Sequence, residues 1–466
     1  MTLNKDYRLR IAPSPTGYPH IGTIYQALFN FAFAKKHNGS FVVRIEDTDQ
    51  KRFVEGAEQI IYSMLDWTNL IEDESPRKGG PYGPYLQSDR LKIYQEYAEK
   101  LIENKSAYYC FCSKERLAEL RTQQLEKKQL PRYDKHCLNV KDAQQRVKNG
   151  EPYVIRLNVL PNRKIWFNDL IRGKIEFDSN LIDDQVLLKS DGFPTYHLAV
   201  VVDDHLMNIT YIVRGEEWIS STPKHILLYQ AFGWDLPIFC HTPDLRNPDK
   251  SKLSKRHGHT DVRWYQKEGY LAEAMLNYLA LLGWSHPGEK EIFSLREFIN
   301  VFDLKDIRAV GPIFDVKKFT WLNGEHIRQL SDQELKLKLL DFFKSDTEVL
   351  TVLNSKQGDM FISLAKARMK TLIEFKYLVE DAKMPKLTLE QKEQVKKVLE
   401  HIKGSNIDWE NGSLLLDNLK QLKAQDVSMK QLYYYITYKE QGLPLIELMQ
   451  SWGKEKTIKR LLDLIN

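Results

Sequence analysis

Short apolar runs alternate with helical periodicity over the first 70 residues of the chain. The run Arg8–Ala12 predicts a strand, and the apolar positions of residues 21–36 recur three and four residues apart, as on one face of a helix. A second apolar run, 41–45, precedes another helical pattern that carries Ile60, Ile61, Met64 and Leu65. A doubly wound parallel sheet begins with this order of strand, helix, strand and helix. The pattern therefore predicts an α/β fold.

The later segments differ from this beginning. Helix and strand signals mix irregularly between residues 91 and 185, as expected of a subdomain inserted into the sheet. Sheet-like runs resume over residues 186–240, and a polar segment follows from residue 241. Beyond residue 330 the pattern is almost wholly helical, and Ser331 and Glu334 have the spacing of a capping box. We expect domain boundaries near residues 90, 185, 240 and 330.

The composition is that of an ordinary globular protein, with 28% charged and 42% hydrophobic residues among 466. No stretch approaches the roughly 20 apolar residues of a membrane span, and residues 1–10 lack the apolar core of a secretory signal. Three of the four cysteines cluster, which fits a metal site or reduced thiols better than a disulfide framework. We expect a cytoplasmic protein without a membrane partner. The net charge of +5 alone predicts no nucleic-acid partner.

Two separated segments carry chemistry. The turn after the first strand, residues 12–20, opens directly into a helix, whose N-terminal N–H groups attract anions, and Gly17 and Gly22 let a nucleotide approach the backbone. Far along the chain stands Lys252-Leu-Ser-Lys-Arg256. Taken singly, the first is more often an ordinary loop and the second a solvated basic cluster. Together they predict a triphosphate held at the helix start and met by lysines.

These segments resemble the two signatures of the class I aminoacyl-tRNA synthetases, here His20-Ile-Gly-Thr23 and Lys252-Leu-Ser-Lys-Arg256. Within that class the chain resembles the bacterial glutamyl-tRNA synthetases nearly from end to end. The strings that carry this likeness are 10–17, 44–49, 83–88, 196–199, 203–205 and 314–315 with Trp321 and Asn323. Glutaminyl enzymes carry a different string at 45–49, and the shorter glutamyl-queuosine relatives lack a helical C-terminal part.

The resemblance implies a Rossmann-like catalytic domain, an inserted α/β subdomain and an all-α C-terminal region. The two halves of the catalytic domain would be residues 1–90 and 186–240, on either side of an acceptor-stem-binding subdomain at 91–185. A stem-contact region with the Lys252–Arg256 loop would occupy residues 241–330, and an anticodon-binding region residues 331–466.

The implied reaction is the ATP-dependent ligation of L-glutamate to the 3′ end of tRNA(Glu) through a glutamyl-adenylate, with Mg²⁺ on the phosphates and release of AMP and pyrophosphate. We expect the protein to be a monomer. Three alternatives stay open at this point: an enzyme that also charges tRNA(Gln), a small-molecule nucleotidyltransferase, and an inactive RNA-binding relative.

The resemblance also implies the site. His20 and Lys255 would be catalytic, acting on the α-phosphate and on the departing phosphates. The residues implied for ATP are Gly22, Thr23, Lys252, Ser254 and Lys255, and Thr23 replaces the second histidine of many class members. Those implied for glutamate are Arg10, Ala12, Ser14, Glu46, Tyr196 and Arg214. Arginine suits this substrate because its fork binds a carboxylate through two hydrogen bonds.

Two further assignments follow from the likeness. Cys110, Cys112 and Cys137 have the spacing of a zinc site in some relatives, but Asn139 stands where the fourth ligand is expected, which leaves Tyr133 or His136 as the substitute. A metal-free cysteine cluster is the alternative. Arg368 lies where relatives carry an arginine that contacts the anticodon, and one basic side chain on a helix face is the alternative there.

Overall fold

The computed structural model describes residues 6–17, 20–253, 260–405 and 408–465. The chain divides into two compact units. The first comprises Met1–Trp264 and Met275–Val316, and the second comprises Tyr265–Ala274 and Lys317–Asn466. Within the described ranges, no helix has both the length and the apolar character to cross a bilayer.

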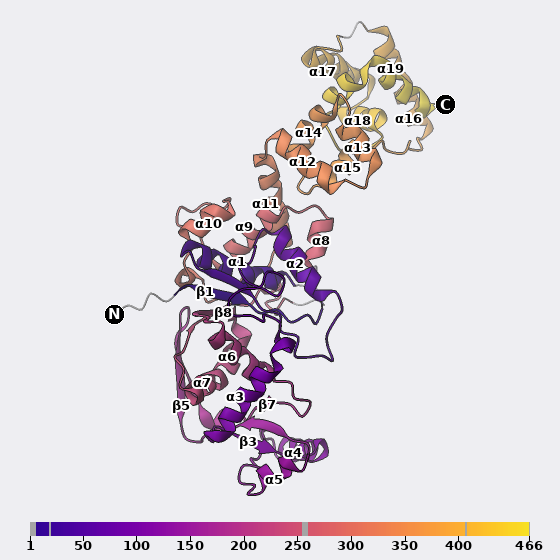
Figure 1. The fold of residues 1–466 in the computed structure, drawn as a ribbon. Helices are drawn as coiled ribbons and strands as arrows, with labels where there is room; N and C mark the ends of the chain where they lie inside the picture. Colours follow the sequence, from indigo (N-terminus) through magenta and orange to yellow (C-terminus); the bar gives the residue numbers. More distant parts are fainter. Residues whose placement is uncertain (1–5, 18–19, 254–259, 406–407, 466) are drawn as a thin grey trace. The chain divides into compact units, whose positions relative to one another are not determined.

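The first unit begins with the predicted strand, helix, strand and helix (Figure 1). These elements are β1 (Arg8–Ile11), α1 (Ile21–Lys36), β2 (Ser40–Val43) and α2 (Ala57–Trp67). The two strands are parallel, and Arg8 pairs with Ser40. Gly39 permits the close return to β1, because a Cβ there would collide with the backbone of Tyr7. The order of strand, helix, strand and helix predicted from the sequence is thus confirmed for this segment.

A four-stranded sheet in the order β6-β5-β9-β8 follows. Its strands are β5 (Lys164–Asp169), β6 (Gly173–Asp178), β8 (Tyr211–Gly215) and β9 (Ile238–Thr242). β8 and β9 are parallel. β9 is also parallel to β5, and the two strands pair at Asp169 and Phe239. The hairpin of β5 and β6 lies within the segment expected to be an insertion, yet it extends the sheet of β8 and β9. Helix α6 (Tyr196–Leu206) directly precedes β8 in the chain, and helix α7 (Thr222–Phe232) lies between β8 and β9.

The remaining strands form an antiparallel sheet of β3 (Ala107–Cys110), β4 (Val154–Leu157) and β7 (Val186–Leu188). Its core joins that of α3 (Leu91–Glu103) and α6. The other helices of this part of the chain are α4 (Lys114–Glu126), α5 (Ala143–Lys148), α8 (Val262–Lys267), α9 (Ala272–Gly283) and α10 (Leu295–Val301). α4 has no fully buried residue.

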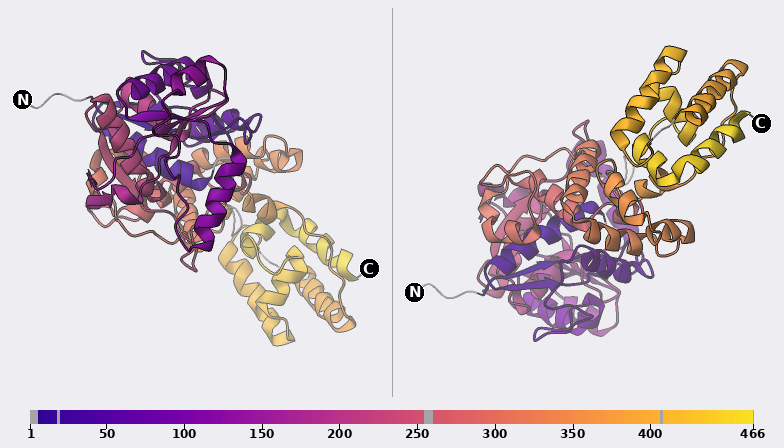
Figure 2. Two further views of the ribbon diagram at one scale, coloured as in Figure 1. Left: turned by 90° about the horizontal axis from the view of Figure 1, so that it is seen from below. Right: turned by 90° about the horizontal axis from the view of Figure 1, so that it is seen from above.

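The second unit is helical, as predicted. Its helices are α11 (Val316–Gln329), α12 (Asp332–Phe342), α13 (Thr347–Leu353), α14 (Gly358–Lys366), α15 (Glu374–Val379), α16 (Leu389–Gly404), α17 (Gly412–Lys420), α18 (Met429–Thr437) and α19 (Leu445–Ile465). The predicted capping box is present at Ser331 and Glu334. Helices α16 to α19 share one apolar core, and both views of Figure 2 show these yellow helices gathered together. Tyr435 is buried in that core and therefore packs helices.

Candidate active site

A cavity of about 550 Å³ opens where β1 and β8 end. In open α/β sheets, ligands bind at the carboxyl ends of the strands. The structure places these predicted site residues on its wall: Arg10, Ala12, Ser14, His20, Gly22, Thr23, Glu46, Tyr196, Arg214 and Lys252. Ser254 and Lys255 lie outside the described residues. The individual roles stay predictions, although the residues expected for glutamate and for ATP meet in one cavity.

His20 forms the N-cap of α1. Its Nδ1 accepts a hydrogen bond from the backbone N–H of Gly22 at 3.0 Å. Because Nδ1 is the acceptor, the neutral ring carries its proton on Nε2. The start of α1 thus combines a donor ring nitrogen with a helix N-terminus that has no acidic side chain in its first turn. This arrangement suits a phosphate.

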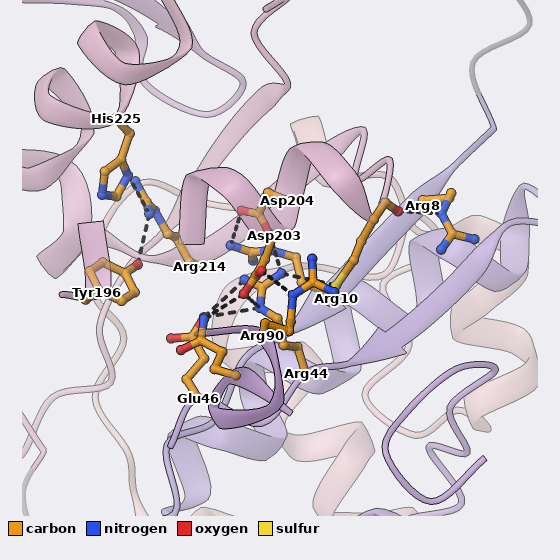
Figure 3. Close-up of polar contacts among 12 residues, drawn as sticks. Arg8, Arg10, Arg44, Glu46, Arg90, Tyr196, Asp203, Asp204, Arg214 and His225 are labelled. Carbon is orange, nitrogen blue, oxygen red and sulfur yellow. Dashed lines mark hydrogen bonds and ion pairs between the residues drawn. The ribbon is translucent and has the colours of Figure 1, made fainter. Parts of the chain in front are cut away.

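Four charged side chains form a buried network beside the cavity (Figure 3). Asp204 accepts two hydrogen bonds from Arg10, at 3.0 and 3.1 Å, and a third from Arg44 at 2.7 Å. Arg44, which is fully buried, also donates to Glu46 Oε1 at 3.0 Å. Both arginine charges are therefore matched by carboxylates within the protein.

Asp203 belongs to the same network of buried charges. It accepts hydrogen bonds from Arg90 at 2.7 Å and from Gln87 at 2.8 Å, and Tyr94 donates to it as well. Arg44 Nε lies 3.6 Å from the same carboxylate. With three arginines facing three carboxylates, the cluster carries no net charge when all are ionised.

Glu46 is the carboxylate of this cluster that reaches the cavity. Burial raises its pKa to about 7, against the opposing effect of Arg44. Both hydrogen bonds from Arg44 go to Oε1, so Oε2 is available to a ligand. A buried carboxylate with a free oxygen suits an ammonium group.

Arg214, near the end of β8, has a different environment. It is 6% exposed, and its hydrogen bonds go to His241 Nε2 (3.1 Å), the Tyr196 hydroxyl (3.1 Å), His225 Nδ1 (3.3 Å) and Thr222 Oγ1 (2.9 Å). Burial lowers the pKa of His225 well below its usual value and that of His241 to about 4, so both rings are neutral near pH 7. Among the described residues no carboxylate pairs with Arg214. A buried positive charge of this kind suits an anionic ligand.

Lys252 closes another side of the cavity. Its Nζ lies 3.0 Å from Asp244 and 3.6 Å from Glu217. Burial opposes its charge, but these carboxylates outweigh that effect and raise its pKa. Burial and the neighbouring Asp244 raise the pKa of Glu217. Lys252 is therefore a cation held in place at the cavity rim.

The three predicted cysteines come together in the segment around β3. Their sulfur atoms lie within 4.8 Å of one another, and all are free thiols. The Tyr133 hydroxyl lies 3.3 Å from the sulfurs of both Cys110 and Cys112, whereas the backbone N–H of His136 donates to the carboxylate of Asp134. Tetrahedral zinc ligated by sulfur at about 2.3 Å keeps its sulfurs about 3.8 Å apart, so three thiols and Tyr133 fit the ion.

Comparison with known proteins decides the family. Residues 6–321 match the family model described as tRNA synthetases class I (E and Q), catalytic domain. The chain belongs to this class I synthetase family. The glutamate–tRNA ligase of Acinetobacter baylyi is 44% identical over 97% of this chain and 92% of its own length. That of Fusobacterium nucleatum is 39% identical over 99% of this chain and 98% of its own.

Solved structures of the class I synthetase family agree. A glutamate tRNA ligase from Elizabethkingia meningosepticum, crystallised with its amino acid, has a TM-score of 0.85 and 33% identity, with 99% of both chains covered. The predicted resemblance and the predicted α/β fold with a helical C-terminal region are therefore confirmed. The alternative that also charges tRNA(Gln) gains no support from these relatives, and a small-molecule nucleotidyltransferase does not match the full-length likeness.

Arg368, predicted to contact the anticodon, lies just after α14 in the second unit. Its Nε donates to the carbonyl of Gly442 at 2.7 Å, and this contact is exposed. Its role in this class I synthetase stays a prediction.

Sequence reasoning missed the residues that hold two charged side chains of the cavity: Thr222, His225 and His241, with Asp169 behind His241, around Arg214, and Glu217 and Asp244 around Lys252. A weak signal existed, since Asp169 and His241 are polar residues near the ends of apolar strands. Thr222 and His225 read only as part of a helix that also carries Ile226, Leu227 and Leu228.

Proposed function

We propose that this chain uses ATP to join L-glutamate to the 3′ end of tRNA(Glu). The glutamate α-carboxylate attacks the α-phosphorus of ATP, and pyrophosphate leaves. A terminal ribose hydroxyl of the tRNA then attacks the carbonyl of the glutamyl-adenylate, and AMP leaves. The observation that carries this proposal is a buried arginine, Arg214, which has only neutral partners and lines the same cavity as the start of α1.

The ligand's charges match those of the cavity. Glutamate carries one net negative charge, and the cluster around Asp203 and Asp204 is neutral when Glu46 is ionised, so Arg214 supplies the balancing positive charge. The side-chain carboxylate would bind Arg214 and Tyr196, and the ammonium group would bind Glu46 Oε2. Arg10 is already paired with Asp204, which makes its part in glutamate binding one of shaping and electrostatic support. Ala12 and Ser14 would line the pocket.

The phosphates would lie over the start of α1. The backbone at Gly22 and Thr23 and the Nε2–H of His20 would face the α-phosphate, and Mg²⁺ would accompany the triphosphate. Lys252, with Ser254 and Lys255 of the same segment, would neutralise the departing pyrophosphate. Such transfers depend on positioning and charge stabilisation, so no protein nucleophile is needed.

The inserted segment and the helical unit would bind tRNA, the latter through Arg368. Cys110, Cys112, Cys137 and Tyr133 would hold Zn²⁺, which would stabilise the fold around β3 and not enter the reaction. We further propose that the protein acts as a monomer in the cytoplasm, where reduced cysteines such as these four are usual.

The direct test measures attachment of labelled glutamate and labelled glutamine to tRNA(Glu) and tRNA(Gln) transcripts. We expect glutamate on tRNA(Glu) alone. A parallel assay follows the exchange of pyrophosphate into ATP with glutamate, with and without tRNA. Attachment of neither amino acid, with no exchange under any condition, would refute the proposal.

A further inference from the structure

Arg214 on β8 is surrounded by residues of two other strands and two helices that are far apart in sequence. Arg214 on β8 and His241 on β9 are paired neighbours in the sheet. Asp169, the last residue of β5, accepts hydrogen bonds from the backbone N–H of His241 at 3.0 Å and from its ring Nδ1 at 2.7 Å. Thr222 and His225 come from the first turn of α7. Figure 3 shows Arg214 between His225 and Tyr196, apart from the cluster of Arg10 and Arg44.

The hydrogen bonds fix which nitrogen of each ring carries the proton. A carboxylate can only accept, so His241 Nδ1 donates to Asp169 and its Nε2 accepts from Arg214. Arg214 can only donate, so Nδ1 of His225 accepts, and the proton of that ring lies on Nε2. That Nε2–H of His225 is donated to His197 Nδ1, and the two nitrogens lie 3.1 Å apart. Both rings that face Arg214 therefore present lone pairs and no charge.

The donors of Arg214 are almost fully used by this shell. A guanidinium has five N–H groups, and the contacts to His241, Tyr196, His225 and Thr222 use four of them. One N–H on Nη2 is left for a ligand. The Tyr196 hydroxyl accepts from Arg214, so its own proton is a second donor beside the first. Two donors and one unmatched positive charge thus define a subsite for one carboxylate.

We propose that Thr222, His225 and His241 are positioning residues that set the substrate preference, because they orient Arg214 through uncharged acceptors and leave its charge for the ligand. This inference rests on the proposed function. Arg10 provides the contrast within the same protein, since its acceptor is the carboxylate of Asp204 and its charge is already matched. Asp169 acts one step further out by holding the tautomer of His241. The low pKa of His241, about 4, keeps that ring an acceptor at neutral pH.

The sharpest test compares Thr222→Asp with Thr222→Asn, which are nearly equal in size and differ in charge. We would measure KM for glutamate and the inhibition constant of glutamine in the tRNA charging assay. We expect Thr222→Asp to raise KM for glutamate at least tenfold more than Thr222→Asn does, while the glutamine constant changes similarly in both. Parallel changes for both amino acids would overturn the proposal.

Milder pairs decide the matter if the buried aspartate prevents folding. Thr222→Val keeps the shape and removes the acceptor, whereas Thr222→Ser keeps it. A lost hydrogen bond to a charged group corresponds to about a tenfold or larger rise in KM for glutamate. We expect that rise for Thr222→Val and for His241→Leu, and less than about threefold for Thr222→Ser and His241→Gln, with KM for ATP unchanged. Equal values within each pair would contradict the inference.

Glutamate attachment by the wild-type protein distinguishes a failure of the proposed function from a failure of the inference about the positioning residues. If the wild-type protein fails to attach glutamate to any tRNA, the proposed function is wrong. If it attaches glutamate and the variant pairs behave alike, the proposed function stands and the proposed role of Thr222, His225 and His241 is wrong.

Discussion

Arg214→Met removes the charge on which the amino-acid subsite depends while keeping a side chain of similar length. Breaking a buried ion pair by removing one partner costs about 3–5 kcal/mol, because the other charge stays buried and unmatched. At about 1.36 kcal/mol for each factor of ten, kcat/KM for glutamate should fall about 150- to 5,000-fold. Glutamine would lose one hydrogen bond from a charged donor to its amide oxygen, which is about 1.5–3 kcal/mol, or about 13- to 160-fold.

The assay is steady-state charging of tRNA(Glu) with glutamate, the inhibition constant of glutamine in the same reaction, and KM for ATP as a check that the rest of the cavity is intact. Arg214→Lys is the matched control, since it keeps the charge and loses the planar fork, and it should fall between the wild type and Arg214→Met. Equal losses for glutamate and glutamine, or a change of less than tenfold for glutamate, would refute the reasoning.

Four other changes test separate parts of the account. Glu46 binds the substrate ammonium only when ionised, so kcat/KM for glutamate should decline as the pH falls below about 7, and Glu46→Gln should remove that decline; an unaltered pH profile in the variant would contradict this role. Arg44→Met leaves buried carboxylates unmatched and should lower the free energy of unfolding by about 3–5 kcal/mol in urea titrations, whereas a loss below about 1 kcal/mol would show that the network is not needed for stability. His20→Ala should lower kcat far more than it raises KM for glutamate, and an effect on KM alone would remove His20 from the transition state. Cys112→Ser should abolish zinc binding, measured by metal analysis of the purified protein, and weaken tRNA binding more than pyrophosphate exchange; equal metal content in the variant and the wild type would rule out this ligand set.

The first part of the fold was predictable because its signal is local. The spacing of apolar residues over 21–36 marks a helix wherever it occurs, and the capping box at Ser331 is formed by residues three positions apart. The placement of β5 was not predictable in this way. Its alternation of buried and exposed residues indicates a strand, but only long-range pairing with β9 shows which sheet it joins.

The site divides in the same manner. The resemblance located Arg10, Glu46 and Arg214 as residues of a pocket, but it could not show that Arg10 is bound to Asp204 whereas Arg214 has neutral partners. That difference arises from the register of β8 against β9 and from the start of α7, which no short motif encodes. The choice between Tyr133 and His136 was open for the same reason, and the geometry favours Tyr133.

The most direct test is a crystal structure of this protein with bound glutamate. The account predicts the side-chain carboxylate within hydrogen-bonding distance of Arg214 Nη2 and the Tyr196 hydroxyl, and the ammonium group beside Glu46 Oε2. A carboxylate bound elsewhere in the cavity, with Arg214 still facing only Thr222, His225 and His241, would contradict it.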